Sequence, residues 1–372
     1  MKVLVTGGGT GGHVIPALAV VKELRAIEPD AQIVYVGSAD GIEARLAVEA
    51  GLRFESVATG KLRRSSKGVR GLLTVANLRD ALRVPLGAVQ AWRLVGREHP
   101  DVVLSTGGYV CVPTVIAAWA RRTPVLTHEQ TLTVGLANRI AGRFAQRIAV
   151  SWEESLAELR PRLRAKAFVS GNPVRASLFA PNGSRFGLPP GLPCVYVTGG
   201  AQGARTVNDA VVARVDHWLE EAVLLHQCGK ADLVRMEAAR AALAPSLQTR
   251  WVVRAFIEDD EIGEAYAAAD VVVGRSGAGT VNDLCALGKA SVLIPLEPTG
   301  GNEQVRNAER LEKVGAAVIV RQVDCTGDAL LAAVRPLLAP SAVRRRMGAQ
   351  ALALSRPDAT KALLDALLSL RR

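Results

Sequence analysis

The chain has 372 residues, of which 49% are apolar and 22% charged, and its formal net charge is +11. This composition is typical of a folded protein and excludes an intrinsically disordered one, while the length exceeds what one ordinary hydrophobic core supports. The N-terminus shows no long apolar segment of the secretory kind, so a cytoplasmic protein is expected.

Short apolar runs of β-type residues alternate with helical patterns in the first half of the chain. Uncharged residues 102–120 are long enough for a membrane span, but Gly107, Gly108 and Pro113 interrupt them, which predicts strand, loop and helix instead. The alternation is typical of an α/β fold with a parallel sheet. Buried strands are expected at 3–5, 33–36, 102–104 and 124–126, with a helix over 16–27.

The same design begins again at residue 194. Residues 4–11 and 194–203 both form an apolar strand that ends in Val-Thr-Gly-Gly, with another glycine three residues later. The repeat predicts two Rossmann-like domains, over residues 1–166 and 167–353. Leucines at helical spacing predict a last helix over 358–370, and residues 354–372 are expected to cross back to the first domain. Further strands of the second domain are expected at 222–225, 251–253, 271–273 and 291–295.

The cysteines are spaced too widely for a metal site. No Cys-x-x-Cys pair occurs, and no histidine lies close enough in sequence to complete a zinc pattern. We expect buried thiols without a catalytic role. The five positions are Cys111, Cys194, Cys228, Cys285 and Cys325.

A glycine-rich loop follows the first strand at residues 7–12, and His13 comes directly after it. The loop satisfies the Gly-x-Gly-x-x-Gly pattern of dinucleotide sites, but no acid ends the second strand, and Asp40 is the nearest one. The pattern therefore disfavours an NAD-dependent oxidoreductase. A histidine at the mouth of such a loop can act as a general base or bind a phosphate, or it can merely cap the helix.

Loops of small residues with one or two polar groups follow several other expected strands. Ligands of open α/β sheets bind beyond the carboxyl ends of the strands, so these loops are candidates for one site, although each alone could be a structural turn. Glu129 could act in catalysis or be a buried structural acid, and Arg275 could be a ligand or an ordinary ion-pair partner. The loops are at 106–109, 128–130, 171–175, 275–280 and 302–304.

Seven motifs then occur in one order: Gly-Gly-Thr-Gly-Gly-His at 8–13, Gly-Gly-Tyr at 107–109, His-Glu-Gln at 128–130, Gly-Asn-Pro-Val-Arg at 171–175, Gly-Gly-Ala-Gln-Gly-Ala at 199–204, Arg-Ser-Gly-Ala at 275–278, and Gln304 with Asn307-Ala308. The set resembles the MurG family of glycosyltransferase family 28. The resemblance implies the GT-B fold, two Rossmann-like domains facing each other across a cleft. It also implies transfer of N-acetylglucosamine from UDP-N-acetylglucosamine to lipid I, which forms lipid II for peptidoglycan.

The resemblance implies a role for each matching position. His13 would be the base that activates the acceptor hydroxyl, with Glu129 as the second catalytic candidate. Gly107, Gly108 and Tyr109 would bind the polyprenyl-diphosphate-linked acceptor. The residues expected to bind the donor are Thr10, Gly11, Gly12, Thr131, Arg175, Ala201, Gln202, Ile257 (through its backbone), Arg275, Thr280, Asp283 and Gln304.

No cofactor is expected for this reaction. An arginine and helix N-termini could stabilise the departing UDP, and the sequence lacks an Asp-x-Asp pair at a strand end, so inverting transfer without a metal is expected. Thr131, Ala201 and Asp283 stand where the family has Asn, Ser and Glu. These departures leave the donor sugar open, and the alternative is a related transferase that uses another UDP-sugar or a secondary-metabolite acceptor.

Positive charge is concentrated between residues 61 and 97, where nine Lys or Arg and one acid, Asp80, give +8. Basic residues beside apolar ones suit an anionic membrane, so a peripheral protein on the cytoplasmic face of the plasma membrane is expected. The leucines could instead be core residues. Nucleic-acid binding is disfavoured because Trp92 is the one aromatic residue available for stacking. The interleaved residues are Lys61, Arg63, Arg64, Lys67, Arg70, Arg79 and Arg83 with Leu72, Leu73, Leu78, Leu82, Leu86 and Trp92.

Overall fold

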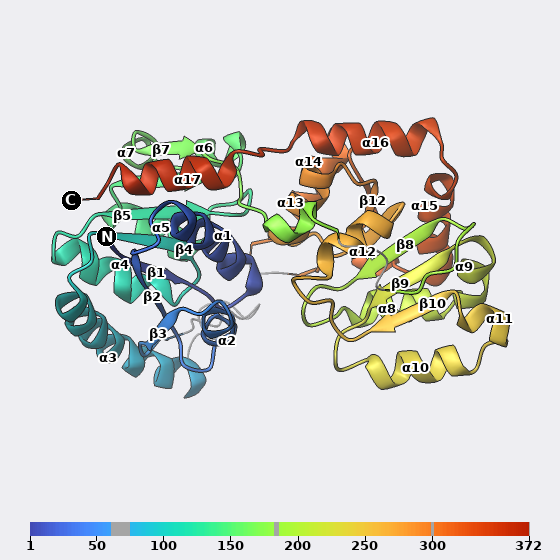
Figure 1. The fold of residues 1–372 in the computed structure, drawn as a ribbon, viewed down its shortest axis with the longest axis horizontal. Coiled ribbons are helices and arrows are strands. Elements are labelled where there is room, and N and C mark those ends of the chain that lie inside the picture. Colours follow the sequence, from blue (N-terminus) through green and yellow to red (C-terminus); the bar gives the residue numbers. More distant parts are fainter. Residues whose placement is uncertain (61–74, 182–185, 299–300, 372) are drawn as a thin grey trace. The chain divides into compact units, whose positions relative to one another are not determined.

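The computed structural model describes residues 1–60, 75–181, 186–298 and 301–371. It divides into two compact units, unit 1 with Met1–Val174 and Arg356–Arg372, and unit 2 with Arg175–Ser355. Each unit has one parallel sheet covered by helices (Figure 1), which confirms the two Rossmann-like domains. Within the described ranges, no helix is both long and apolar enough to cross a membrane.

Unit 1 has a seven-stranded sheet in the order β3-β2-β1-β4-β5-β6-β7, and all neighbouring strands are parallel. The strand order reverses between β1 and β4. In open sheets of this kind, ligands bind beyond the carboxyl ends of the strands at such a reversal. The strands are β1 (Lys2–Gly7), β2 (Gln32–Gly37), β3 (Arg53–Ser56), β4 (Val102–Gly107), β5 (Val125–Glu129), β6 (Arg147–Val150) and β7 (Ala167–Val169).

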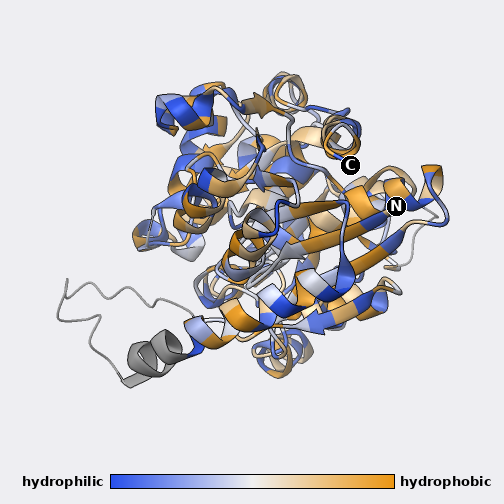
Figure 2. Cartoon of the chain, turned by 90° about the vertical axis from the view of Figure 1, so that its left-hand side faces the viewer, coloured by the Kyte–Doolittle hydropathy of each residue, from blue (hydrophilic) through white to orange (hydrophobic). Residues whose placement is uncertain are grey.

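Helices cover both faces of this sheet because successive side chains of a strand point to opposite faces. Val3 and Val5 pack in a core with α1 and α17, whereas Leu4 packs in a second core with α3 and α4. The apolar strands and the mixed surfaces of the helices around them are visible in Figure 2. The helices are α1 (Gly11–Ile27), α2 (Ile42–Glu49), α3 (Val75–Glu98), α4 (Cys111–Ala120), α5 (Leu136–Phe144), α6 (Glu153–Glu158), α7 (Pro161–Arg164) and α17 (Ala359–Leu368).

The last helix returns to unit 1, as expected. Leu363, Leu364 and Leu367 of α17 are buried in the same core as α1, and Arg371 forms an ion pair with Glu28. Full burial of a leucine side chain contributes about 1.5–3 kcal/mol. Burial of these three leucines therefore favours the docked position of the helix on unit 1.

The expected boundary between the domains is corrected by strand β7. Its residues pair with β6, and the Ser170 N–H donates to the Val150 carbonyl at 2.9 Å. Residues 167–174 therefore belong to unit 1, and the boundary lies after Val174 rather than after residue 166. The return to unit 1 begins at Arg356 rather than at residue 354.

Unit 2 repeats the arrangement with a six-stranded parallel sheet in the order β10-β9-β8-β11-β12-β13. Its strand order reverses between β8 and β11. The strands are β8 (Cys194–Thr198), β9 (Val223–Gln227), β10 (Trp251–Arg254), β11 (Val271–Gly274), β12 (Ser291–Leu293) and β13 (Val318–Ile319). The helices are η2 (Ala176–Phe179), α8 (Arg205–Val212), α9 (Val215–Glu221), α10 (Leu233–Ala241), α11 (Pro245–Gln248), α12 (Ile262–Ala268), α13 (Ala278–Leu287), α14 (Glu303–Lys313), η3 (Gln322–Asp324), α15 (Gly327–Leu338) and α16 (Ala342–Ala353).

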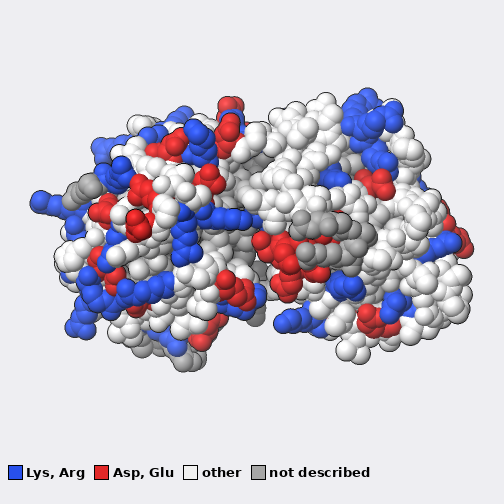
Figure 3. All heavy atoms as spheres, viewed as in Figure 1, with Lys and Arg blue, Asp and Glu red and all other residues white. Residues whose placement is uncertain are grey.

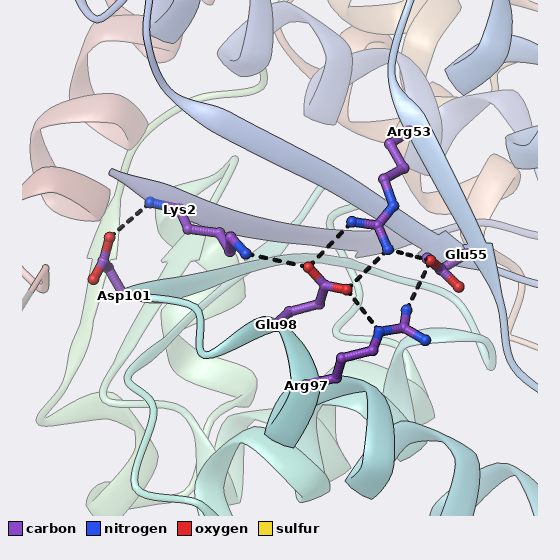
Figure 4. A network of polar contacts seen from close by, with 6 residues as sticks. All are labelled: Lys2, Arg53, Glu55, Arg97, Glu98 and Asp101. Carbon is purple, nitrogen blue, oxygen red and sulfur yellow. Dashed lines mark hydrogen bonds and ion pairs between the residues drawn. The ribbon is translucent and has the colours of Figure 1, made fainter.

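A network of charged side chains joins β1, β3 and the end of α3 (Figure 4). Glu98 is 4% exposed and accepts hydrogen bonds from Lys2, Arg53 and Arg97 at 2.9–3.3 Å. Glu55 binds the same two arginines at 2.6 and 2.7 Å. Burial alone would raise the pKa of Glu98, but the hydrogen bonds from Arg97, Lys2 and Arg53 outweigh it and lower that pKa.

Replacing Glu98 with glutamine is expected to lower the free energy of unfolding at pH 7 by about 1–3 kcal/mol, because three cations lose their buried partner. The folded-state pKa of Glu98 is depressed, so its contribution is present above the ordinary value of 4.5 and is lost as the pH falls through the folded pKa. Denaturant unfolding should therefore show the two proteins converging in acid. Glu49→Gln, which breaks an exposed pair with Arg45, is the control and should cost less than about 0.5 kcal/mol. Equal effects of both substitutions would contradict the role of Glu98.

Candidate functional site

The loops after β1 and β4 are packed against each other through their backbones. The Gly8 N–H donates to the Gly107 carbonyl at 3.2 Å. Gly108 has a φ of +79°, and a Cβ atom there would lie 2.1 Å from the Gly8 carbonyl oxygen. Gly107 and Gly108, expected to bind the acceptor, are therefore also required by the fold. Tyr109 lies beside Gly9, so it borders the first glycine loop.

A buried acid that the motifs do not indicate, Glu43, supports the first glycine loop. Its carboxylate is fully buried and accepts hydrogen bonds from the Gly9 N–H at 3.1 Å and the Ser38 N–H at 3.0 Å. Gly8, Gly37 and Gly41 have no room for a side chain because this carboxylate lies against them. Backbone N–H groups that could hold a cofactor phosphate are thus bound to the chain itself. The glycines around Glu43 are the one sequence signal for it.

His13 is the third residue of α1, so the start of that helix places it at the carboxyl ends of β1 and β4. Its side chain is partly exposed. Nδ1 lies 2.8 Å from the Gln130 amide oxygen and 3.0 Å from the Thr106 carbonyl oxygen. A carbonyl oxygen only accepts hydrogen bonds, so Nδ1 carries the proton and Nε2 keeps its lone pair. An imidazole in this state can accept a proton at Nε2.

Gln130 and His128 lie behind His13 in the interior. Both are buried, and the Gln130 amide nitrogen donates to the Thr106 carbonyl at 2.8 Å. The same nitrogen lies 3.1 Å from Nδ1 of His128. Burial lowers the pKa of His128 to about 4, so this imidazole is neutral near pH 7.

Both carboxylate oxygens of Glu129 accept hydrogen bonds from residues that follow it closely in sequence. One carboxylate oxygen accepts from the Thr131 N–H at 3.0 Å and lies 2.7 Å from the Thr131 hydroxyl, which is also near the Thr133 carbonyl. The other accepts from the Gly135 N–H at 2.8 Å and the Asn138 amide at 2.9 Å. This geometry favours the structural alternative for Glu129 and leaves His13 as the base candidate. Thr131, expected to bind the donor, here supports the loop.

Gly11 and Gly12 differ from the glycines that the fold requires. A Cβ atom at either position would be 3.7–3.8 Å from its nearest neighbour among the described residues, which is ordinary contact. Thr10, which precedes them, is exposed and makes no side-chain capping bond. The start of α1 therefore leaves space beside His13, and such space with helix N–H groups suits an anionic ligand.

In unit 2, the loops after β11 and β12 are tied together. The Ser276 hydroxyl donates to the Gln304 carbonyl at 2.7 Å, and the Asn307 amide donates to the Ser276 carbonyl at 3.0 Å. The Gln304 side-chain oxygen accepts from the Leu296 N–H at 3.0 Å. These bonds bring Arg275, Thr280 and Gln304 to the carboxyl end of β11, beside the strand-order reversal.

The two arginines expected to bind the donor have different surroundings. Arg275 donates to the carbonyls of Ile294 and Pro295 at 3.0 and 3.2 Å, which do not neutralise its charge. Arg175 instead forms an ion pair with Asp259 at 2.9 Å. Arg275 is therefore the better-placed cation for a phosphate, whereas Arg175 is engaged within unit 2.

Asp283 is an interior group. It is 7% exposed, and burial raises its pKa to about 6, against the opposing effects of nearby Arg175 and of the Tyr266 hydroxyl. Its carboxyl group thus lies among side chains of unit 2. A contact of this acid with a ribose stays a prediction.

The remaining residues expected at the donor site are distributed over two loops and one helix. Ala201 and Gln202 are exposed in the loop after β8, and Thr280 is partly exposed on α13. Ile257 follows β10 and is 1% exposed, and its contact with a base stays a prediction. Within the described residues, no group of three or more His, Cys, Asp or Glu side chains is arranged to hold a metal ion.

Gly277 and Gly279 at the start of α13 have open space on the side where a Cβ atom would lie, since no described heavy atom comes within 4 Å of that position. Gly279→Ala should therefore leave the fold intact, with up to about 1 kcal/mol gained in helix propensity. If the donor phosphates approach this backbone, the methyl group should weaken UDP binding by about tenfold, or 1.4 kcal/mol. Calorimetric titration with UDP measures the affinity, and thermal unfolding of the same variant is the control. An unchanged affinity would place the phosphates elsewhere.

The cysteines are buried as expected, apart from the partly exposed Cys325. Burial raises the pKa of Cys111 to about 11 and those of Cys194 and Cys285 to about 12. Thiols of this kind are not nucleophiles near pH 7.

Comparison with known proteins identifies the class to which this fold and these sites belong. The N-terminal domain of glycosyltransferase family 28 matches residues 3–150, and the C-terminal domain of that family matches residues 194–363. The chain belongs to glycosyltransferase family 28 and is a glycosyltransferase.

Full-length relatives narrow the class. The chain is similar to a protein of Salinibacter ruber, with 38% identity over 99% of this chain and 96% of the relative. It is 36% identical to a protein of Anaeromyxobacter dehalogenans strain 2CP-C, over 100% of this chain and 94% of the relative. It is 35% identical to a protein of Listeria monocytogenes serotype 4b, over 100% of both chains. Each is named UDP-N-acetylglucosamine--N-acetylmuramyl-(pentapeptide) pyrophosphoryl-undecaprenol N-acetylglucosamine transferase. The expected resemblance to the MurG family is confirmed.

Solved structures show the same fold. MurG of Acinetobacter baumannii is 24% identical with a TM-score of 0.71, and 99% of each chain is covered. The glycotransferase of kitacinnamycin is 15% identical with a TM-score of 0.72, covering 100% of this chain and 99% of that one. The fold is therefore that of GT-B glycosyltransferases.

Proposed function

We propose that this chain transfers N-acetylglucosamine from UDP-N-acetylglucosamine to N-acetylmuramyl-(pentapeptide) pyrophosphoryl-undecaprenol, which is lipid I, and so forms lipid II of peptidoglycan. The names of relatives that match over the full length support the substrates. The observation that carries the proposal is the state of His13, whose Nδ1–H is bound to two oxygens while Nε2 keeps its lone pair.

The reaction follows from these groups. Nε2 of His13 takes the proton of the acceptor hydroxyl as its oxygen attacks the anomeric carbon of the sugar. The bond from that carbon to the UDP oxygen breaks, and UDP leaves with the electron pair, so the configuration at the anomeric carbon is inverted. Arg275 and the N-terminus of α13 stabilise the negative charge of the leaving group. No step requires a metal ion.

A transfer assay tests the proposal. Purified protein is incubated with a soluble lipid I analogue and a panel of UDP-sugars, with and without EDTA. Transfer from UDP-N-acetylglucosamine at the same rate in EDTA supports both the substrates and the metal-free mechanism. UDP binding without transfer to lipid I would overturn the acceptor and favour the alternative, a related transferase with another UDP-sugar or a secondary-metabolite acceptor.

We further propose that unit 1 binds the anionic membrane that holds the lipid acceptor, as a peripheral protein on the cytoplasmic face. The surface that supports this, called the α3–α4 surface, has side chains that are 36–52% exposed. Arg121 lies over the Trp92 ring at 4.2 Å, so a cation accompanies the apolar groups. The residues of the surface are Val84, Leu86, Val89 and Trp92 on α3 with Ile116 and Trp119 on α4.

The exposure of Leu86 and Trp92 favours the membrane interpretation over a core role for these two residues. On the face seen in Figure 3, unit 1 carries Lys and Arg with Asp and Glu among them, unlike the single-sign stripe typical of nucleic-acid binding. Lys61, Arg63, Arg64, Lys67, Arg70, Leu72 and Leu73 lie outside the described residues, as do the side chains of Leu78, Arg79 and Leu82.

Sedimentation with vesicles tests the membrane proposal. Binding to vesicles that contain phosphatidylglycerol should weaken by about tenfold in a Leu86→Ser, Trp119→Ser variant, since two apolar side chains no longer enter the interface. Val234→Ser in unit 2 is the matched control because Val234 is 82% exposed but lies outside the α3–α4 surface. Equal binding of both variants would contradict the role of this surface in membrane binding. A salt-sensitive gel shift with nucleic acid would instead favour nucleic acid as the partner.

A further inference from the structure

We infer that Gln130 and His128 are positioning residues that select the tautomer of His13 in which Nε2 can accept a proton. The inference rests on the proposed role of His13 as the base. Both side chains are buried, and the proposed mechanism assigns a role to neither of them.

Gly171, His128, Gln130 and His13 form a chain of hydrogen bonds, which we call the relay. Its first step determines which nitrogen of His128 carries the proton. Nε2 of His128 lies 3.0 Å from the Gly171 carbonyl oxygen, which only accepts, so Nε2 carries the proton. The imidazole is neutral because it is fully buried, and a neutral ring with its proton on Nε2 has an acceptor at Nδ1. The Ser151 hydroxyl, at 3.4 Å from Nε2, donates instead to the Glu129 carbonyl at 2.8 Å.

The second step orients the amide of Gln130. Its nitrogen faces three acceptors: the Thr106 carbonyl oxygen at 2.8 Å, Nδ1 of His128 at 3.1 Å and the His128 carbonyl oxygen at 3.3 Å. The opposite orientation would place the amide oxygen against the lone pairs of all three. The amide oxygen therefore faces His13, 2.8 Å from Nδ1.

The third step sets the proton on His13. Nδ1 faces the Gln130 oxygen and the Thr106 carbonyl oxygen, and it can satisfy both only by carrying the proton. The other neutral tautomer would bury a lone pair against two acceptors and would protonate Nε2, the nitrogen that the reaction needs free. The chain of bonds from Gly171 to His13 thus excludes the unreactive tautomer.

Nitrogen NMR of protein labelled with ¹⁵N-histidine tests the inference without substrate. Five histidines give five pairs of ring-nitrogen signals, and His13→Gln identifies the pair of His13. Wild-type His13 should show a protonated Nδ1 and an unprotonated Nε2 when neutral. In Gln130→Leu, which removes the amide donor and acceptor but leaves the Thr106 carbonyl at Nδ1, part of the His13 population should shift to the other tautomer, and kcat should fall severalfold with little change in KM for the UDP-sugar.

In Gln130→Glu, one carboxylate oxygen still accepts from Nδ1 of His13, so Nδ1 should stay protonated, whereas the second oxygen replaces the amide donor that faces Thr106 and His128. Gln146→Leu, which removes an amide that binds the backbone of β5, is the control and should leave the His13 signal unchanged.

Two results would overturn the relay: a wild-type His13 protonated at Nε2, or an unchanged His13 signal in Gln130→Leu. Failure of the proposed function looks different. Full turnover in a His13 variant would remove His13 as the base, whatever tautomer the NMR spectra show.

Discussion

His13→Ala is expected to lower kcat for transfer by about 10²–10⁴-fold, the usual contribution of a positioned general base. The substitution removes the one nitrogen that the bonds to Gln130 and Thr106 leave ready to accept a proton. The affinity for UDP should change little, because Arg275 and Gln304, which are expected to bind the donor, are in unit 2. A loss that appears in kcat and not in UDP binding would assign His13 to the chemical step.

His13→Gln and His217→Ala are the companion variants. Glutamine retains a donor near the Gln130 oxygen but no base, so it should be as slow as alanine. His217 is an exposed histidine on α9 that contacts Asp216, and its removal should not change the rate. Steady-state kinetics with a lipid I analogue and calorimetry with UDP give the two quantities. A His13→Ala protein with full turnover would rule out His13 as the base.

Gly108→Ala is expected to destabilise unit 1 by about 3 kcal/mol or more, the largest effect we expect on stability from one methyl group. A φ of +79° costs an alanine about 1–2 kcal/mol, and its Cβ atom would lie 2.1 Å from the Gly8 carbonyl oxygen. Because the obstacle is backbone, either the β4 loop or the first glycine loop must move. Activity should fall with stability.

Gly315→Ala separates the cost of a positive φ from the cost of the steric clash. Gly315 has a similar φ of +75°, but no described heavy atom lies within 4 Å of the added methyl position. It should cost only the conformational part, about 1 kcal/mol. Denaturant unfolding of both variants measures the difference, and hydrogen exchange assigns it to a unit. Equal losses would mean that the contact between the loops after β1 and β4 is not tight.

For the proposed site, the sequence predicts which motifs lie close together but not what each residue does. His13, the loop at 106–109 and the His-Glu-Gln motif follow three apolar strands, and the carboxyl ends of neighbouring parallel strands meet at one edge of a sheet. Their proximity could therefore be predicted. The roles within the motif could not, because they depend on where the side chains of the neighbouring residues Glu129 and Gln130 point.

The apolar pattern of the sequence also could not predict the short edge strands or the domain boundary. The edge strand β3 has four residues and contains Arg53 and Glu55, so it has no clear apolar run. β13 has only two residues, although the sequence around it is apolar. β7 has three residues, and only its pairing with β6 shows that residues 167–174 belong to unit 1. Edge strands are recognised by their partners more than by their composition.

The sequence by itself determined the fold class and the repeat of two Rossmann-like domains, because these follow from local apolar periodicity and from glycine spacing. The family followed from the resemblance of seven motifs, and the return of the last helix from fold analogy. Only the tertiary structure decided which polar groups act together. His13 meets Thr106 and Gln130 across 93 and 117 residues of chain, and Glu43 meets the first glycine loop across 34. Hydrogen bonds of that range depend on the directions of side chains at a sheet edge, which no local pattern contains.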